Sequence, residues 1–345
     1  MFININNKIY IVNVIYVNME IKIDKIDRRI IYELDINARI PATKLSKKLH
    51  LSREKVNYRI NNLIKKGIIR KFVTMINPVK LGYSVYKMFF KFQNLDKDKE
   101  KEMISYLMKN NYIYWIASAQ GRWDLNMTIF AKDITHFDEI LSDFIFKYGK
   151  YILEQEFNTT LKVGILSKNW ILEENNAERK ISIFGGRVEN TPIDKTDVEI
   201  LRILANNGRM NSTEIARKIK STERKVIYRM KNLEKLGIIL GYTTSLNLEL
   251  LNMQFFKATI DLNLLSQNEK NKLIEYCRNN PNLGFFVFCV GSWPFEAEFI
   301  VKNNKQFYNI LDGFRQKFPE IKGFETIIFP IEYKFDWMPL CYKAE

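Results

Sequence analysis

Cysteine and histidine are both scarce in this chain of 345 residues. The three cysteines, Cys277, Cys289 and Cys341, are odd in number and form no Cys-x-x-Cys pair. The sequence therefore argues against a disulfide scaffold and a structural zinc site, and it favours a reducing, cytoplasmic compartment. Only His50 and His136 are present, which argues against chemistry based on histidine. We expect no metal ion and no cofactor.

Long apolar runs are also missing. No stretch approaches the roughly 18 residues that a membrane span needs, so we expect no membrane partner. The longest run near the start, Ile9 to Val17, has about nine residues and lacks the basic start and small-residue cleavage site of a secretory signal. We expect residues 1–22 to form an extension or arm, with an added edge strand as the alternative. Whether Met1 or Met19 is the true start stays open.

Acidic residues are outnumbered, because 54 Lys and Arg stand against 39 Asp and Glu and give a net charge of +15. The excess is concentrated in two segments. Residues 24–70 hold 13 basic and 5 acidic residues, and residues 193–241 hold 11 and 6. A charge needed only for solubility would be spread over the chain, whereas concentrated positive charge is typical of proteins that bind phosphates.

The chain is a tandem repeat with an offset of 170 residues. Between residues 23–69 and 193–239, 20 of 47 positions are identical. The same offset pairs Gly121 with Gly291 and Trp123 with Trp293. A period this long exceeds that of solenoid repeats, so each copy should be a folded unit. We call residues 23–163 the first copy and residues 193–335 the second copy.

Each copy opens with three short helical patterns, of which the third is capped by Ser52 or Thr222 and stops at Gly67 or Gly237. Two short helices and a longer one predict a helix-turn-helix, and alternation from Ile68 to Ile76 predicts a small β-wing. The remainder of each copy predicts strands and helices in the order βαββαβ, the ferredoxin-like arrangement.

The predicted fold class is α+β, with two winged helix-turn-helix units and two ferredoxin-like domains. An open sheet must cover its exposed face, so we expect the copies to pack as an intrachain pseudo-dimer, with Val85, Phe89, Phe255 and Thr259 on facing first strands. The expected domains are an extension 1–22, winged helix-turn-helix 23–80, ferredoxin-like domain 81–163, linker 164–192, winged helix-turn-helix 193–250, ferredoxin-like domain 251–335 and tail 336–345.

The third helix of each copy is the predicted DNA-contacting element. Arginine pairs well with guanine and asparagine with adenine, while lysine suits phosphates. The expected DNA-binding residues are Ser52, Arg53, Lys55, Asn57, Tyr58, Arg59, Asn61 and Lys65, and in the second copy Thr222, Arg224, Lys225, Tyr228, Arg229 and Lys231. Because Arg53 becomes Glu223 and Asn57 becomes Ile227, we expect an operator that is not a true palindrome.

These segments resemble the Lrp/AsnC family of transcription regulators. The matching stretches are IDKIDRRIIYELDINARIPATKLSKKLHLSREKVNYRINNLIKKGIIRKF and GRWDL in the first copy, and IDKTDVEILRILANNGRMNSTEIARKI, VIYRMKNLEKLGIILGY and GSWPF in the second. The resemblance implies a sequence-specific, DNA-binding transcriptional regulator with RAM-type ferredoxin-like domains. It also implies self-association through those domains and a small effector such as an amino acid.

The resemblance places an effector site at the hairpin turn that holds Gly121 and Asp124; a plain tight turn at Gly121 is the alternative. Family members usually carry one unit per chain, whereas this chain carries two. The second copy has Gly291 but Pro294 at the position of Asp124, so it should lack the site.

Two other functions fit part of this pattern. A non-specific architectural DNA-binding protein would rely on phosphate contacts alone. The sirohaem decarboxylases share the two-part architecture but use His and Arg around this hairpin, and neither histidine of this chain lies there. We therefore expect no catalytic residue and no enzymatic activity.

Overall fold

The computed structural model describes residues 2–5, 8–11, 23–172, 179–263, 265–339 and 341–342. The expected extension at 1–22 falls mostly outside these ranges. Its two described segments, β1 (Phe2–Ile5) and β2 (Lys8–Ile11), pair as antiparallel strands.

Each copy begins with the three predicted helices. They are α1 (Lys25–Ile36), α2 (Ala42–Leu49) and α3 (Arg53–Lys65), and in the second copy α6 (Lys195–Asn206), α7 (Ser212–Lys218) and α8 (Glu223–Lys235). The third helices start where their caps were expected. Ser52 accepts a hydrogen bond from the Lys55 backbone at 3.2 Å, and Thr222 accepts one from Lys225 at 3.3 Å. We call each three-helix unit a head.

The expected wing is a strand, but its partner is not local. β3 (Ile69–Ile76) pairs with β9 (Ile239–Leu246) of the other copy, as an antiparallel two-stranded sheet. Short helical turns, η1 (Pro78–Lys80) and η4 (Glu249–Leu251), follow the two strands in place of a tight hairpin. Because neither strand folds back as a hairpin, each strand forms its hydrogen bonds with the strand of the other copy. The first helix of each copy also packs on the other copy's strand, α1 on β9 and α6 on β3.

The ferredoxin-like domains have the predicted βαββαβ order. The first contains β4 (Ser84–Phe92), α4 (Lys97–Lys109), β5 (Ile113–Ser118), β6 (Leu125–Ala131), α5 (Ile134–Tyr148) and, after η2 (Gly149–Tyr151), β7 (Ile152–Leu166). The second contains β10 (Gln254–Leu262), α9 (Gln267–Asn279), β11 (Leu283–Gly291), β12 (Phe295–Val301), α10 (Asn304–Lys317) and β13 (Ile321–Ile328).

Both domains belong to one ten-stranded sheet that also includes β14 (Glu332–Phe335) and β8 (Ile181–Gly185). The strand order is β13-β10-β12-β11-β7-β4-β6-β5-β14, and β8 pairs with β7 off this path. The expected linker, 164–192, is partly structured. Its first residues belong to β7, and it also contains η3 (Asn169–Ile171) and β8 (Ile181–Gly185). The C-terminal part of β7 pairs with β11 on one side and with β8 on the other, which places this part of the expected linker in the sheet.

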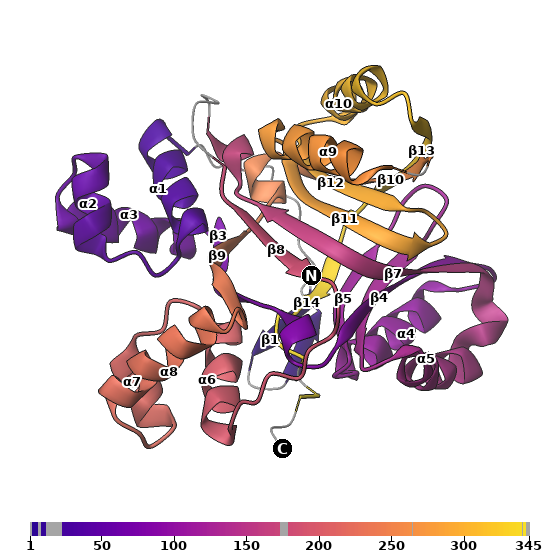
Figure 1. Ribbon diagram of the computed structural model, residues 1–345. Coiled ribbons are helices and arrows are strands. Elements are labelled where there is room, and N and C mark those ends of the chain that lie inside the picture. The colour runs from indigo at the N-terminus through magenta and orange to yellow at the C-terminus, as the bar shows by residue number, and fades with distance from the viewer. Residues whose placement is uncertain are drawn as a thin grey trace.

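The two copies are joined by equivalent strand pairs. Ile165 of β7 lies opposite Phe285 of β11, and Phe335 of β14 (Glu332–Phe335) lies opposite Trp115 of β5. These two pairs are related by the same offset of 170, so each copy extends a strand onto the other. Figure 1 shows the two heads on the left, on either side of β3 and β9, and the sheet with its helices on the right.

An apolar cluster packs between the inner faces of the two domains. The Phe89 ring lies 4.8 Å from the Trp293 ring, and the Trp115 ring lies 5.1 Å from the Phe329 ring. Each of these ring pairs joins a residue of the first copy to one of the second. The cluster therefore holds the inner faces of the two domains against each other. The chain therefore forms the expected intrachain pseudo-dimer.

Candidate nucleic-acid interface

The third helices turn their apolar residues inward and expose their polar residues. Val56, Ile60 and Leu63 are buried, as are Val226, Met230 and Leu233. Tyr58 and Tyr228 are both 71% exposed. The other expected contact residues that are exposed are Ser52, Arg53, Lys55, Asn57, Asn61 and Lys65, and Thr222, Arg224, Lys225 and Lys231. These two exposed surfaces are the candidate DNA-contacting faces.

Arg59 and Arg229, which we expected to contact phosphate, are engaged within their own heads. Arg59 Nη1 lies 2.8 Å from both Asp24 and Asp27 at the start of α1. Hydrogen bonds to Asp27 and Asp24 raise the pKa of Arg59. Arg229 makes the equivalent pairs with Asp194 and Asp197, at 2.7 and 3.0 Å. Each arginine thus ties its third helix to the first. The signal in the sequence was the pair of aspartates three residues apart.

Two arginines to which the sequence assigned no role connect the heads. Arg39 Nη1 donates to the carbonyls of Gly208 and Met210, at 2.9 and 2.7 Å. Arg209 Nη1 donates to the carbonyl of Ala38 and, at 3.2 Å, to that of Ile40. Burial lowers the pKa of both guanidinium groups. We call this reciprocal arrangement the arginine clasp.

Backbone hydrogen bonds support the clasp. The Ala38 N–H donates to Tyr242 on β9, and the Gly208 N–H donates to Phe72 on β3, both at 2.9 Å. A Cβ at Gly208 would lie 2.8 Å from the backbone of Val73, so only glycine fits this approach. The turn between the first two helices of each head is therefore docked on the strand of the other copy, which sets the relation between the two heads.

The contacts of Gly121 and Asp124 are accounted for without a ligand. The Asp124 carboxylate accepts hydrogen bonds from Lys91 Nζ and the Phe92 N–H, both at 2.8 Å. Gly121 has φ +124°, and a Cβ there would lie 2.8 Å from the Thr326 carbonyl on β13. Both residues fix the hairpin against neighbouring strands, and neither lines the cavity between the domains.

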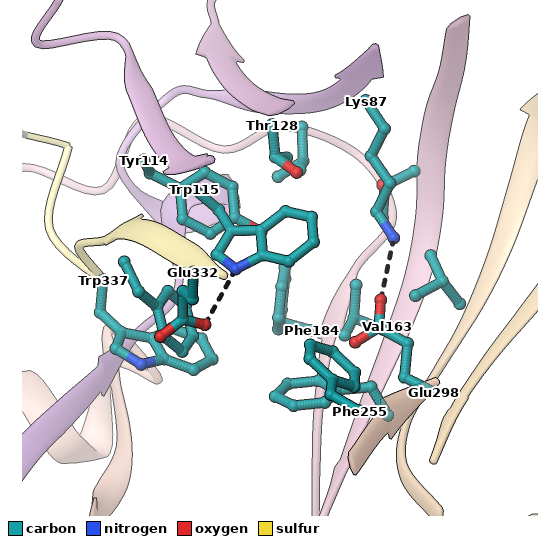
Figure 2. A pocket seen from close by; sticks show the side chains of 15 residues that line it. Lys87, Tyr114, Trp115, Thr128, Val163, Phe184, Phe255, Glu298, Glu332 and Trp337 are labelled. Atoms are coloured by element: carbon teal, nitrogen blue, oxygen red, sulfur yellow. Dashed lines mark hydrogen bonds and ion pairs between the residues drawn. The ribbon is translucent and has the colours of Figure 1, made fainter. Parts of the chain in front are cut away.

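That cavity has a volume of about 80 Å³ and lies between the inner faces of the two domains (Figure 2). It is lined by Val85, Lys87, Tyr114, Trp115, Thr128, Thr160, Val163, Phe184, Phe255, Phe285, Val287, Glu298, Glu332, Phe335 and Trp337. The positively charged Lys87 and the negatively charged Glu298 both line the cavity, and most of the remaining wall is aromatic or aliphatic. Burial raises the pKa of Tyr114 to about 12, so its hydroxyl is a neutral hydrogen-bonding group at pH 7.

Neither a metal site nor a membrane-spanning helix occurs in the described ranges. No cluster of three or more His, Cys, Asp or Glu side chains there is placed to hold a metal ion. No helix within them has the length and apolar character to cross a membrane. His136 Nδ1 accepts a hydrogen bond from the Lys132 backbone N–H at 3.2 Å.

Comparisons with known proteins agree with this geometry. A family model described as winged helix-turn-helix DNA-binding matches residues 23–70 and 193–239. An uncharacterised HTH-type transcriptional regulator of Pyrococcus furiosus is 30% identical over 148 residues, covering 43% of this chain and 95% of that protein. The HTH-type transcriptional regulator FL11 of Pyrococcus abyssi is 32% identical over 123 residues, covering 36% of this chain and 80% of that protein.

A solved structure has the same overall arrangement. The crystal structure of the siroheme decarboxylase NirDL superposes with a TM-score of 0.60 at 12% identity, covering 90% of this chain and 92% of that one. At this identity the likeness concerns the fold alone. The Pyrococcus relatives, by contrast, are matched over most of their own length by less than half of this chain. The chain therefore belongs to the family of HTH-type transcriptional regulators and carries two copies of the winged helix-turn-helix unit in one polypeptide.

Proposed function

We propose that this protein is a sequence-specific transcriptional regulator that places α3 and α8 in successive major grooves on one side of a DNA duplex. The observation that carries this proposal is the pair of exposed polar helix faces held in one relation by β3, β9 and the arginine clasp. Two helix-turn-helix heads fixed in this way bind half-sites about one helical turn apart or a multiple of it.

Phosphate contacts supply affinity in this proposal, and base contacts supply specificity. Lys55 and Lys225 occupy equivalent, exposed positions in the first turns of α3 and α8. They suit phosphates, because an ammonium group neutralises a phosphate without reading a base. Asn57, two residues further along α3 and also exposed, suits an adenine edge.

The two faces differ in ways that predict unlike half-sites. Ile227 stands where the first head has Asn57 and is 39% exposed, so it can pack against a thymine methyl group. Glu223 replaces Arg53, and its carboxylate accepts a hydrogen bond from Ser212 at 2.6 Å. A carboxylate held at the helix start disfavours a phosphate or a guanine at that place. The natural operator is then an ordered pair of different half-sites.

Selection from a random DNA pool tests this proposal. We expect enrichment of two unlike half-sites in one order. A swap variant then carries Arg53→Glu, Glu54→Arg, Asn57→Ile and Asn61→Lys together with Glu223→Arg, Arg224→Glu, Ile227→Asn and Lys231→Asn. It should select the same half-sites in reverse order. Two identical half-sites would contradict the unequal heads, and no enrichment would favour the architectural alternative.

The cavity between the domains supports a small effector as the finer part of the proposal. A single water needs roughly 10–15 Å³ on this scale, so about 80 Å³ holds several waters or one small organic molecule. Lys87 and Glu298, which lie 3.8 Å from each other, can each add a hydrogen bond to the carboxylate and to the ammonium group of an amino acid, and the Val163 and Phe255 walls suit a short apolar side chain. We therefore place a small amino-acid effector here, and not at Gly121 and Asp124.

Thermal shift measurements with the twenty free amino acids test the effector. A ligand should raise the melting temperature of the wild type and change its DNA affinity. Val163→Phe fills the cavity and should abolish both effects while leaving DNA binding without ligand intact. If none of the twenty shifts the wild type, the effector proposal is wrong and the DNA-binding proposal stands.

The fold likeness to a siroheme decarboxylase raises catalysis as a second candidate. A tetrapyrrole has dozens of non-hydrogen atoms, and pockets for ligands of even drug size measure roughly 300–1,000 Å³. The cavity between the domains measures about 80 Å³, which is too small for a tetrapyrrole. A larger hollow of about 510 Å³ lies beside α5 and β7, but no His, Lys or Arg side chain of the described residues lines it to hold the iron or the acidic side chains of a tetrapyrrole. Titration with an iron porphyrin, followed by its visible absorption, should show no saturable binding. A saturable, stoichiometric spectral change would revive the enzymatic alternative.

A further inference from the structure

Two lysines are buried where the copies meet. Lys87 on β4 and Lys257 on β10 occupy equivalent positions in the repeat and are 5% and 0% exposed. Both ammonium groups reach the same carboxylate. Lys87 pairs with Glu296, and Lys257 Nζ lies 3.1 Å from it. A buried ammonium group costs several kcal/mol unless it is paired, so the partners of these lysines decide whether the copies can meet at all.

All of the carboxylates come from one copy. Glu296 and Glu298 lie on β12, and Glu298 is 3.2 Å from Lys257 and 3.8 Å from Lys87. The equivalent positions on β6 are Asn126 and Thr128, which are uncharged and buried. Asn126 Oδ1 accepts a hydrogen bond from Lys257 at 3.1 Å, and Glu296 also accepts one from the Trp293 indole at 3.0 Å. Figure 2 shows Lys87 and Glu298 pointing toward each other across the interface.

Counting these charges separates the three conceivable pairings. The first copy with the second buries two lysines and two glutamates, and the charges cancel. Two first copies would bury two lysines with only Asn126 and Thr128, and two second copies would bury two lysines with four glutamates. Both like pairings leave two uncompensated charges in a buried place, which is a severe penalty.

We propose that Lys87, Lys257, Glu296 and Glu298 form a pairing code, which allows the first copy to pair only with a second copy. The occupant of the inner sheet face is thus the other copy of this same chain, or the complementary copy of a second chain, and never a like copy. Within one chain the linker raises the effective concentration of the correct partner, so a single chain closes on itself. This inference concerns assembly and does not rest on DNA binding.

Two full-length variants test the code. Variant X carries Glu296→Asn and Glu298→Thr, so that both copies resemble the first. Variant Y carries Asn126→Glu and Thr128→Glu, so that both resemble the second. Each variant alone should fail to close, with a melting temperature lowered by roughly 10 °C or more. Co-expressed X and Y should instead pair with each other, as a species of twice the 41.0 kDa mass of one chain.

A third variant guards against simple misfolding. It combines the four substitutions of X and Y and so moves both carboxylates to the first copy while keeping the charges balanced. It should be a monomer that melts close to the wild type. Light scattering after size exclusion measures the masses, and calorimetry measures the melting. The proposal fails if X alone melts like the wild type, if the third variant is as unstable as X, or if co-expressed X and Y do not associate.

Discussion

Arg39 and Arg209 each donate hydrogen bonds to the two backbone carbonyls that flank the other. They lie 170 residues apart, at equivalent positions of the repeat. Each guanidinium also lies over an aromatic ring on the strand of the other copy, with Arg39 5.3 Å from the centre of the Tyr242 ring and Arg209 5.6 Å from that of Phe72. The two heads are therefore connected at their turns as well as through β3 and β9.

Replacing Arg39 by Ala should loosen this connection. The carbonyls of Gly208 and Met210 would lose a charged donor, a kind of hydrogen bond worth roughly 1.5–3 kcal/mol. We expect lower stability and weaker discrimination among spacings of the two half-sites. Calorimetry and gel shifts on duplexes whose half-sites differ in spacing by single base pairs measure the two effects. Arg70→Ala, an exposed arginine on β3, is the control; an unchanged spacing optimum in Arg39→Ala would contradict the role of the clasp.

Lysines and arginines of the third helices should differ in their effect on salt dependence. Lys55→Ala with Lys225→Ala should lower the slope of log affinity against log salt by about 2, because each phosphate contact contributes about 0.9. Arg59→Ala with Arg229→Ala should lower the melting temperature, because the pairs with Asp27 and Asp197 are lost, and should leave the slope nearly unchanged. Lys101→Ala on α4 controls for net charge. A slope that falls with the arginines and not with the lysines would reverse our assignment.

Gly121→Ala should destabilise the protein by roughly 1–3 kcal/mol, because φ is +124° and the added Cβ meets the Thr326 carbonyl. Gly323→Ala is the matched control, since nothing lies within 4 Å of its added Cβ. Urea denaturation of both variants measures the difference. Equal stability of the two variants would mean that the hairpin accommodates the side chain by moving away from β13.

Lowering the pH should reduce the stability of the fold by protonating Glu296. Burial opposes ionisation, but the ammonium groups of Lys257 and Lys87 outweigh it and hold the pKa of Glu296 at about 2. A depressed folded-state pKa stabilises the fold above the unfolded value of about 4.3, and this contribution is lost as the pH falls toward 2. The urea midpoint of the wild type should fall across this window. Glu296→Gln should have a lower midpoint at pH 7 and a smaller fall; a parallel fall in both proteins would exclude Glu296 as the cause.

Much of the local structure was visible in the sequence because its signals are short-range. The caps at Ser52 and Thr222, the helical spacing of Val56, Ile60 and Leu63, and the alternation of the strands are all encoded within about a dozen residues. The exposed faces of α3 and α8 followed from the same spacing. The ion pairs of Arg59 could not be predicted in this way, because its partners at the start of α1 are about thirty residues away in the chain.

By itself the sequence determined that the chain is a tandem repeat, that each copy begins with a helix-turn-helix and that the positive charge is concentrated there. Only the tertiary structure decided that β3 pairs with β9, that β7 and β14 extend onto the other copy, and that Lys87 meets Glu296. The physical reason is that a period of two identifies the buried face of a strand but not the edge with which it bonds. Which strand edge is free to pair, and which charged side chain a buried lysine meets, depends on residues more than a hundred positions away in the chain.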